Sequence, residues 1–491
     1  MTPRPNGGKS MPDSAVFNKI SRIALIEPAV RCECLTSEIF AQIRASLPFL
    51  AGALSAAGYG CGIYCEELID LRPHISKIAS AFPAAGISVT INTVRRAIEI
   101  ARSLKKSNPE IIIIFGGSLA ASFAGELLAA GDYCLNGRAE TTLPMLLNAL
   151  NAGRAPDEIP NLIRISEGKI FKSEREAAAA DFKSDYSAVL NFGNFSEKRS
   201  ILHFNKPPLY SVFASTGCVN SCRFCVSEKK YIKRRPENVI DDFKNIIRIH
   251  KGFFPPRFML VDDCAFGDAG YLKNILSQLA ALRKKNNFSL MMQFHVLPLL
   301  KDPSLPELFK RAGVSTLLIG FESASDVSLR RERKGTTVNQ NIKAIEICRR
   351  HGITPYGYFV AGFDSDSAES VKDIFNFISQ HSLAAQVLPV GVMKTAGAGS
   401  RSGGPETLDP YSFGASMKVS HIPENMAPWV LQEILIEGYD RIYSFSRAAM
   451  MKTFREKLYN LFFSLCYLKW RPGPVKHLNY LKLLQRFSKR S

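Results

Sequence analysis

Short apolar runs alternate with helix-like stretches along the first third of the chain. The runs have the length of strands, and the stretches between them carry apolar side chains at helical spacing, most clearly at residues 47–57, 94–105 and 142–151. The expected strands are residues 22–26, 62–64, 86–90, 111–115 and 132–135. Because strands that alternate with helices form parallel sheets covered on both faces, residues 21–155 are predicted to fold as a doubly wound α/β domain.

A second series of strand and helix patterns fills the middle of the chain, from residue 206 to residue 420. Its six expected strands are residues 210–214, 257–261, 289–294, 316–320, 354–361 and 386–390. Six such units indicate a partial (β/α)6 barrel, and the chemistry of this class of barrel lies at the carboxyl ends of the strands. The polar stretch 156–205 is expected to be a linker with one hairpin at residues 162–172.

The two ends of the chain differ from the domains in composition. Residues 1–20 are expected to form a disordered tail, because they are mostly polar and rich in Pro, Gly and Ser. Residues 421–491 are expected to form a basic helical extension, with helices at 427–445 and 448–468 and a break at residues 472–474 before a last helix. No signal-peptide core is evident and no stretch reaches about 18 uninterrupted apolar residues, so a cytoplasmic protein is expected.

The formal net charge of +19 is concentrated towards the C-terminus. From residue 441 to residue 491 the chain has twelve Lys or Arg residues and one acidic residue, Glu456, with aliphatic and aromatic side chains between them. Three interpretations fit this pattern: a helix docked on its own barrel with a solvated basic face, a helix on an anionic membrane surface, and a nucleic-acid contact. Composition alone leaves all three open.

Three cysteines with the spacing C-x3-C-x2-C follow the first strand of the expected barrel. They are Cys218, Cys222 and Cys225. Cysteine thiolates hold iron–sulfur clusters, normally four to a cubane, so three neighbouring thiolates leave one iron of a [4Fe-4S] cluster open to a substrate or cofactor. The spacing differs from that of ferredoxins, and no second pair completes a zinc ribbon. The motif therefore predicts a cluster that takes part in chemistry.

This motif resembles that of the radical S-adenosylmethionine (radical SAM) superfamily. The resemblance implies that the amino and carboxylate groups of S-adenosyl-L-methionine chelate the open iron. It also implies that the reduced cluster cleaves this cofactor to a 5'-deoxyadenosyl radical, and that the aromatic residue before the third cysteine, Phe224, lies against the adenine.

Several strand ends of the barrel resemble the same family. Asp262 and Asp263 follow the second strand, Glu322 follows the fourth in a Gly-Phe-Glu-Ser run, and Lys334 begins a Lys-Gly-Thr-Thr run. By analogy, Glu322 and either Asp262 or Asp263 contact the ribose or amino group of the cofactor, because carboxylates accept paired hydrogen bonds. The same analogy assigns Lys334 to the cofactor site.

Two strand ends of the first domain carry small residues, Ser88 and Thr90 at one and Gly116 and Gly117 at the other. Ligands of doubly wound sheets bind beyond the carboxyl ends of the strands, where glycine lets a flat ligand approach the backbone. A flavodoxin-like domain directly before such a barrel resembles the cobalamin-binding domain of cobalamin-dependent radical SAM enzymes. The resemblance implies that these four residues bind cobalamin.

The first domain departs from other cobalamin proteins in two respects. The D-x-H-x-x-G motif that supplies a cobalt-ligating histidine is absent, and His74 does not lie in such a motif. Cobalamin is therefore expected to bind without a histidine ligand from the protein. The glycine- and glutamate-rich signature of the family after the fifth strand is degraded here to Gly137-Arg138-Ala139-Glu140.

The whole resemblance implies a cobalamin-dependent radical SAM enzyme, of the subgroup with hopanoid-modifying and anaerobic porphyrin-cyclising enzymes. The expected reaction is methylation of an unactivated carbon in a small or lipid-like substrate. Oxidative cyclisation or skeletal rearrangement without methyl transfer is the alternative, and tRNA modification is less favoured. The resemblance also implies an external electron donor of the flavodoxin or ferredoxin type. Nucleic acid is not an expected partner, and a peripheral contact of the basic C-terminus with the inner face of the membrane stays open.

Overall fold

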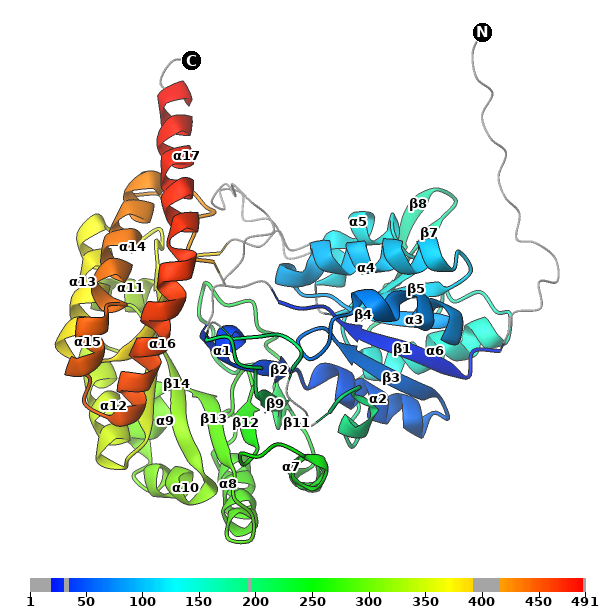
Figure 1. The fold of residues 1–491 in the computed structure, drawn as a ribbon, viewed down its shortest axis with the longest axis horizontal. Coiled ribbons are helices and arrows are strands. Elements are labelled where there is room, and N and C mark those ends of the chain that lie inside the picture. The colour runs from blue at the N-terminus through cyan, green and yellow to red at the C-terminus, as the bar shows by residue number, and fades with distance from the viewer. Residues whose placement is uncertain are drawn as a thin grey trace.

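The computed structural model describes residues 19–30, 35–117, 119–192, 196–200, 202–391 and 416–488. Most of the expected N-terminal tail, residues 1–18, lies outside the described residues. Two sheets with their covering helices lie side by side, and the C-terminal helices pack on the outer side of the second (Figure 1).

The first sheet has the strand order β3-β1-β4-β5-β6-β7-β8. Its parallel strands are β1 (Arg22–Glu27), β3 (Gly60–Cys65), β4 (Ala84–Ser88), β5 (Ile112–Gly116) and β6 (Tyr133–Leu135). Its covering helices are, on one face, α2 (Ser46–Ala56) and α6 (Ala139–Asn151), and on the other α3 (Ile75–Ala81), α4 (Val94–Ser107) and α5 (Ala124–Leu128). The predicted doubly wound α/β fold is confirmed.

Alternate residues of the central strand β1 face opposite layers of helices. Ile23 and Leu25 pack in the core that includes α2 and α6, whereas Ala24 and Ile26 pack in the core that includes α3 and α4. All four side chains are fully buried, which explains why the strand is apolar throughout. The strand order reverses between β1 and β4, and ligands of such sheets bind outside the carboxyl ends of the strands at this point.

The second sheet is parallel throughout, in the order β16-β15-β14-β13-β12-β9-β2. Six of its strands are those predicted for the barrel: β9 (Pro208–Val212), β12 (Arg257–Leu260), β13 (Ser289–Phe294), β14 (Val314–Glu322), β15 (Thr354–Ala361) and β16 (Ala384–Pro389). The helices between these strands are α7 (Pro236–Ile249), α8 (Ala269–Arg283), α9 (Val296–Lys301), α10 (Leu305–Ala312), α11 (Asp326–Arg331), α12 (Val338–Arg350) and α13 (Ala368–Gln380). The loop after β9 contains a short antiparallel pair, β10 (Ser215–Thr216) and β11 (Ile232–Lys233). The predicted partial barrel is confirmed.

The seventh strand of this sheet comes from the N-terminal region. Strand β2 (Ala41–Ile43) follows helix α1 (Leu35–Ile39) and pairs in parallel with β9, so that Ala41 lies opposite Pro208. From the sequence these residues are expected in the first domain, whereas their backbone pairs in the second sheet. A strand of three residues is too short to show a period, so only its tertiary partner identifies it.

The polar segment between the domains packs against both sheets. Its hairpin, β7 (Leu162–Ser166) and β8 (Lys169–Lys172), extends the first sheet in antiparallel fashion from β6. Farther along, the buried Tyr186 donates its hydroxyl proton to the carbonyl oxygen of Ser211 in β9. The segment is therefore packed against the domains it connects.

The C-terminal extension is helical, as expected. Its helices are α14 (Pro428–Ile442), α15 (Phe445–Met450), α16 (Phe454–Trp470) and α17 (Pro472–Ser488). Stacked rings join them, with the centroids of Tyr443 and Phe463 4.8 Å apart. In the part of the chain that the structure describes, none of the helices is both long and apolar enough to cross a membrane.

Candidate active site

The cysteine loop leaves the barrel after β9 and is held at its base by β10 and β11. The backbone N–H of Cys218 donates to the carbonyl oxygen of Glu228 over 2.7 Å. The neighbouring Gly217 has a φ of 77°, and a Cβ there would lie 2.1 Å from the carbonyl oxygen of Lys230. Glycine is therefore required for the close approach of the two sides of the loop.

Cys218, Cys222 and Cys225 line one cavity of about 220 Å³ at the carboxyl ends of the barrel strands. All three are free thiols, Cys218 buried and the other two partly exposed. Among the described residues, no three His, Cys, Asp or Glu side chains converge as the ligands of a single metal ion would. A cubane cluster places each thiolate on a different iron, so its ligands need not converge on one point.

Four other predicted residues, Phe224, Asp263, Glu322 and Lys334, line the same cavity. Asp262 does not. Its carboxylate accepts hydrogen bonds from the backbone N–H of Ala214 and the hydroxyl of Ser215, both over 2.7 Å, and burial raises its pKa to about 6. These bonds hold the turn after β9, whereas Asp263 lines the cavity and its carboxylate accepts from the backbone N–H of Gly217 over 2.9 Å.

Glu322 and Lys334 form a buried ion pair in the cavity wall, with 2.8 Å between Oε1 and Nζ. Burial alone would lower the pKa of Lys334, but the Glu322 carboxylate outweighs it and the pKa of Lys334 is raised. Glu322 has a φ of 65°, and the register of β14 with β15 shifts just before it. A Cβ at Gly320 would lie 2.3 Å from Oε1 of Glu322. The irregular strand end thus leaves room for the carboxylate at the cavity.

Two residues of this region were missed by the sequence analysis. His295 lines the cavity, accepts a hydrogen bond from the backbone N–H of Leu297 at Nδ1, and has its pKa lowered to about 3 by burial and by Lys334. The buried Cys264 neighbours Cys218, and the interaction of the two thiols lowers the pKa of Cys218 and raises the pKa of Cys264. Both residues stand just after barrel strands, where side chains point to the chemistry of this fold, and that position was the available signal.

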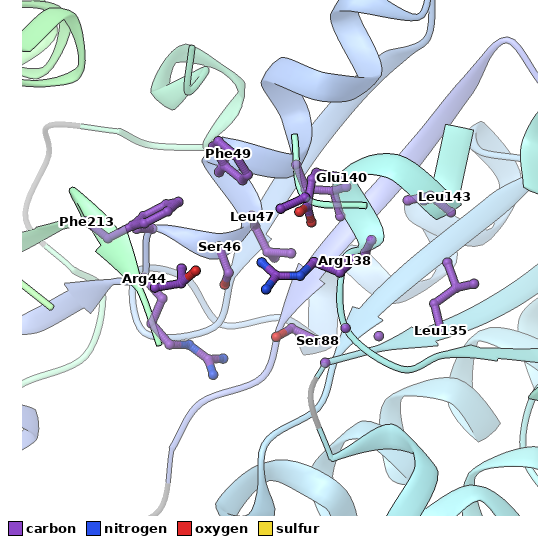
Figure 2. A pocket seen from close by; sticks show the side chains of 18 of the residues that line it. Arg44, Ser46, Leu47, Phe49, Ser88, Leu135, Arg138, Glu140, Leu143 and Phe213 are labelled. Atoms are coloured by element: carbon purple, nitrogen blue, oxygen red, sulfur yellow. The ribbon is translucent and has the colours of Figure 1, made fainter. Parts of the chain in front are cut away.

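A second cavity, of about 580 Å³, lies between the two sheets, and we call it the inter-sheet cavity (Figure 2). Ser88, Gly116 and Gly117 line it at the carboxyl ends of β4 and β5, next to the point where the strand order reverses. Gly117 has a φ of 135°, and a Cβ there would lie 2.3 Å from the carbonyl oxygen of Val89. Thr90 lies outside this lining, where it caps the helical turn Ile91–Thr93.

None of the described residues that line this cavity is a histidine. His74 lies beside Tyr64 instead, with 6.2 Å between the ring centroids. Figure 2 shows Arg138 reaching into the cavity, and its guanidinium pairs with Glu228 of the cysteine loop over 2.7 Å. Asp263 borders both this cavity and the cysteine cavity. The cysteine loop therefore stands between the two.

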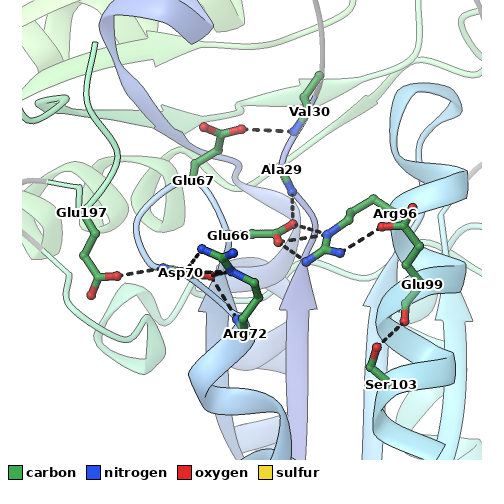
Figure 3. Close-up of polar contacts among 10 residues, drawn as sticks. All are labelled: Ala29, Val30, Glu66, Glu67, Asp70, Arg72, Arg96, Glu99, Ser103 and Glu197. Atoms are coloured by element: carbon green, nitrogen blue, oxygen red, sulfur yellow. Dashed lines mark hydrogen bonds and ion pairs between the residues drawn. The ribbon is translucent and has the colours of Figure 1, made fainter. Parts of the chain in front are cut away.

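A third cavity, of about 670 Å³, is lined by charged side chains beyond the ends of β1 and β3. Figure 3 shows Arg96 of α4 bridging Glu66 and Glu99, with 2.5 Å between Arg96 and Glu66. Glu66 also accepts from the backbone N–H of Ala29, and these bonds lower its pKa in spite of burial. The network ties the loop after β1 to β3 and α4, which is a structural role.

Comparison with known proteins places these features in a family. Residues 212–378 match the model of the radical SAM superfamily. Anaerobic magnesium-protoporphyrin IX monomethyl ester cyclase of Rubrivivax gelatinosus is 26% identical over 354 residues, which are 67% of this chain and 60% of the relative. Bacteriochlorophyllide d C-12(1)-methyltransferase of Chlorobaculum tepidum is 32% identical over 177 residues, 35% of this chain and 38% of the relative. Hopanoid C-3 methylase of Methylococcus capsulatus is 25% identical over 282 residues, 56% of this chain and 52% of the relative.

The chain thus spans less than two thirds of the length of each of these relatives. Among solved structures, the cobalamin-dependent S-adenosylmethionine radical enzyme OxsB, with aqua-cobalamin and S-adenosylmethionine bound, superposes with a TM-score of 0.65. The identity is 15%, and the match covers 94% of this chain and 72% of that one, which shows a shared fold. Residues 212–378 thus carry a radical SAM domain, and the chain shares the fold of a cobalamin-dependent radical SAM enzyme.

Proposed function

We propose that this protein is a cobalamin-dependent radical SAM enzyme that methylates an unactivated carbon of a small or lipid-like substrate. The observation that carries the proposal is the placing of two cavities on either side of the cysteine loop. One is lined by the three cysteines, the other by the glycine-rich edge of the first sheet, and Asp263 borders both. Similarity to two methyltransferases supports methyl transfer as the reaction.

The residues present fit the cofactors that this function requires. Cys218, Cys222 and Cys225 are free thiols on one loop and would hold three irons of a [4Fe-4S] cluster. The volume of the inter-sheet cavity falls within the roughly 300–1,000 Å³ of cofactor sites. A Cβ at Gly116 would meet no protein atom within 4 Å. When bound, the cluster with S-adenosyl-L-methionine supplies a carbon radical and methylcobalamin supplies a methyl group.

The chain's own part is to bind, orient and exclude water. We assign the polar groups of S-adenosyl-L-methionine to Asp263, Glu322 and Lys334, and its adenine to Phe224. The ring of Phe224 packs 5.3 Å from that of Phe363, which gives the adenine an apolar wall. Ser88, Gly116 and Gly117 are assigned to cobalamin, with no histidine ligand. Enclosure by apolar side chains protects a radical from side reactions.

The alternative function is oxidative cyclisation or skeletal rearrangement, which the similarity to the magnesium-protoporphyrin cyclase supports. Both functions use the same cluster and the same radical. They differ in whether the product gains a methyl group, so product analysis separates them.

The test uses protein reconstituted anaerobically with iron, sulfide and isotopically labelled methylcobalamin, and supplied with S-adenosyl-L-methionine, a reductant, and hopanoid and porphyrin substrates. We expect 5'-deoxyadenosine and a product that carries the labelled methyl group. The Cys222→Ala variant should form neither. A product without the label would reject methyl transfer in favour of the alternative, and 5'-deoxyadenosine formation by the variant would reject the cluster assignment.

Two partners complete the proposal. An external flavodoxin- or ferredoxin-type protein supplies the electron, and reduction of the reconstituted cluster by such a donor, followed by electron paramagnetic resonance, tests it. The basic C-terminal extension provides a peripheral contact with a membrane, which would bring the enzyme to a lipid-like substrate.

A further inference from the structure

Helix α16 is apolar on two opposite sides. One side packs into the molecule through Phe463, Cys466, Tyr467 and Trp470. The other side exposes Phe454, Leu458, Leu461 and Leu468, whose exposed fractions are 81%, 38%, 39% and 60%, with the half-buried Leu465 among them. We call these five residues the outer stripe. Docking of the helix on the barrel therefore leaves a second apolar face uncovered.

The outer stripe is continuous along the helix. Its members stand at i, i+4, i+7, i+11 and i+14, which at 3.6 residues per turn places them within about 80° of one another. With a rise of 1.5 Å per residue, the stripe is about 21 Å long. Single exposed apolar side chains are common on proteins, but an aligned row of this length marks an interaction surface.

Neighbouring helices add exposed apolar side chains to this end of the molecule. On α15 they are Phe445 and Met450, exposed by 48% and 73%. On α17 they are Tyr480, Leu483 and Leu484, exposed by 52%, 49% and 38%. Helix α16 packs against both of these helices.

Basic side chains border the outer stripe. Lys457 and Lys469 fall on either side of it, each about 60° around the helix from its centre. Lys469 reaches Glu38 over 3.3 Å and is still 58% exposed. The acidic groups nearby are engaged: Glu456 is buried against Arg349 over 2.6 Å, and Asp440 pairs with Arg471 over 2.7 Å. The surface around the stripe is therefore positively charged.

We propose that the outer stripe of α16 is the surface by which this protein lies on an anionic lipid bilayer. Its leucines and Phe454 would enter the boundary between headgroups and acyl chains, and Lys457 and Lys469 would reach the lipid phosphates. A second copy of the chain is disfavoured as the occupant, because two such basic surfaces repel each other and the net charge of each chain is +19. The proposal holds whether the enzyme methylates or cyclises its substrate.

The test is co-sedimentation of the full-length protein with vesicles of phosphatidylcholine alone or mixed with phosphatidylglycerol. We expect binding to the mixed vesicles that weakens at high salt. The variant Leu461→Gln/Leu468→Gln should bind at least about tenfold more weakly, because two apolar side chains no longer leave water. Lys457→Gln should weaken binding roughly fivefold. The matched control is Phe253→Gln, which removes a side chain that is 89% exposed on the barrel and should bind as the wild type does.

A gain of signal tests the same surface independently. A tryptophan introduced as Phe454→Trp should shift its fluorescence to shorter wavelength on mixed vesicles and be quenched by brominated lipid. Failure of the wild type to bind the mixed vesicles would overturn the proposal. So would binding that the stripe variant retains, or a wild-type dimer that this variant dissociates without any change in vesicle binding.

Discussion

At the residue scale, the cysteine loop depends on Gly217. An alanine there would place its Cβ 2.1 Å from a carbonyl oxygen at a φ of 77°, so Gly217→Ala should destabilise the loop by about 1–3 kcal/mol. We expect the reconstituted variant to lose most of its iron, measured per protein. Gly58→Ala is the control, because Gly58 also has a positive φ, 83°, but a Cβ there would meet nothing within 4 Å. Equal iron in the two variants would show that the clash is relieved without loss of the cluster site.

The buried pair of Glu322 and Lys334 makes a second residue-scale prediction. Lys334→Met would leave the Glu322 carboxylate buried and unpaired, which typically costs about 3–5 kcal/mol. The double variant Glu322→Gln/Lys334→Met should regain most of the melting temperature, because no charge is left unpaired. If both residues contact the cofactor, both variants should still fail to form 5'-deoxyadenosine. An active double variant would mean that the pair is structural only.

The contribution of the same pair to the stability of the protein should be insensitive to pH near neutrality. The pKa of Lys334 is raised in the folded protein, so the stability that it contributes is fully present below its ordinary pKa of 10.5. That contribution is lost only as the pH rises through the higher folded value. Between about pH 6 and pH 9, the difference in melting temperature between the wild type and the double variant should therefore stay constant. A difference that falls steadily over this range would contradict the raised pKa.

At the scale of elements, the sequence pattern predicts the repeated strand and helix units and misses the short strand β2. Most strands of both sheets were expected because they are apolar runs followed by helical patterns, and the cysteine spacing marked the loop after β9. Strand β2 was missed, because three residues show no period and its partner lies far along the chain. Cofactor-binding residues were expected, from the resemblance, at four strand ends with carboxylate or small side chains. Two of these residues, Asp262 and Thr90, instead make hydrogen bonds that hold local backbone turns. Which of two neighbouring side chains faces a cavity depends on packing that no local pattern records.

Strand β2 carries a prediction of its own. The backbone N–H of Ala41 donates to the carbonyl oxygen of Pro207 over 3.0 Å. Arg44 and Ala45, just after the strand, line the inter-sheet cavity. Ala41→Pro removes this hydrogen bond, so it should lower stability by about 1–3 kcal/mol and reduce the corrinoid retained after gel filtration. Ile170→Pro, in the outer strand β8, is the matched control. It should lower stability without changing retention, and a loss of corrinoid in both variants would remove the special role of β2.

At the scale of the whole molecule, three of the contacts that join the two sheets bear on the site. Strand β2 places a piece of the N-terminal region in the second sheet, and Tyr186 of the linker bonds to β9. The third connection is the ion pair between Arg138 and Glu228. It is the one that reaches the cysteine loop, because the carbonyl oxygen of Glu228 accepts the N–H of Cys218. A ligand in the inter-sheet cavity would therefore act on the cysteine loop through Arg138.

This coupling can be measured as protection of the cluster. The pair of Arg138 and Glu228 is partly exposed, so Arg138→Gln should cost less than about 1 kcal/mol and hardly change the melting temperature. In the reconstituted wild type, bound hydroxocobalamin should slow the loss of iron to a chelator, because it fixes Arg138 and with it the loop. In Arg138→Gln this slowing should disappear, whereas Arg72→Gln, which removes an exposed pair with Asp70 elsewhere, should keep it. If hydroxocobalamin protects the cluster equally in all three proteins, the ion pair does not connect the two cavities.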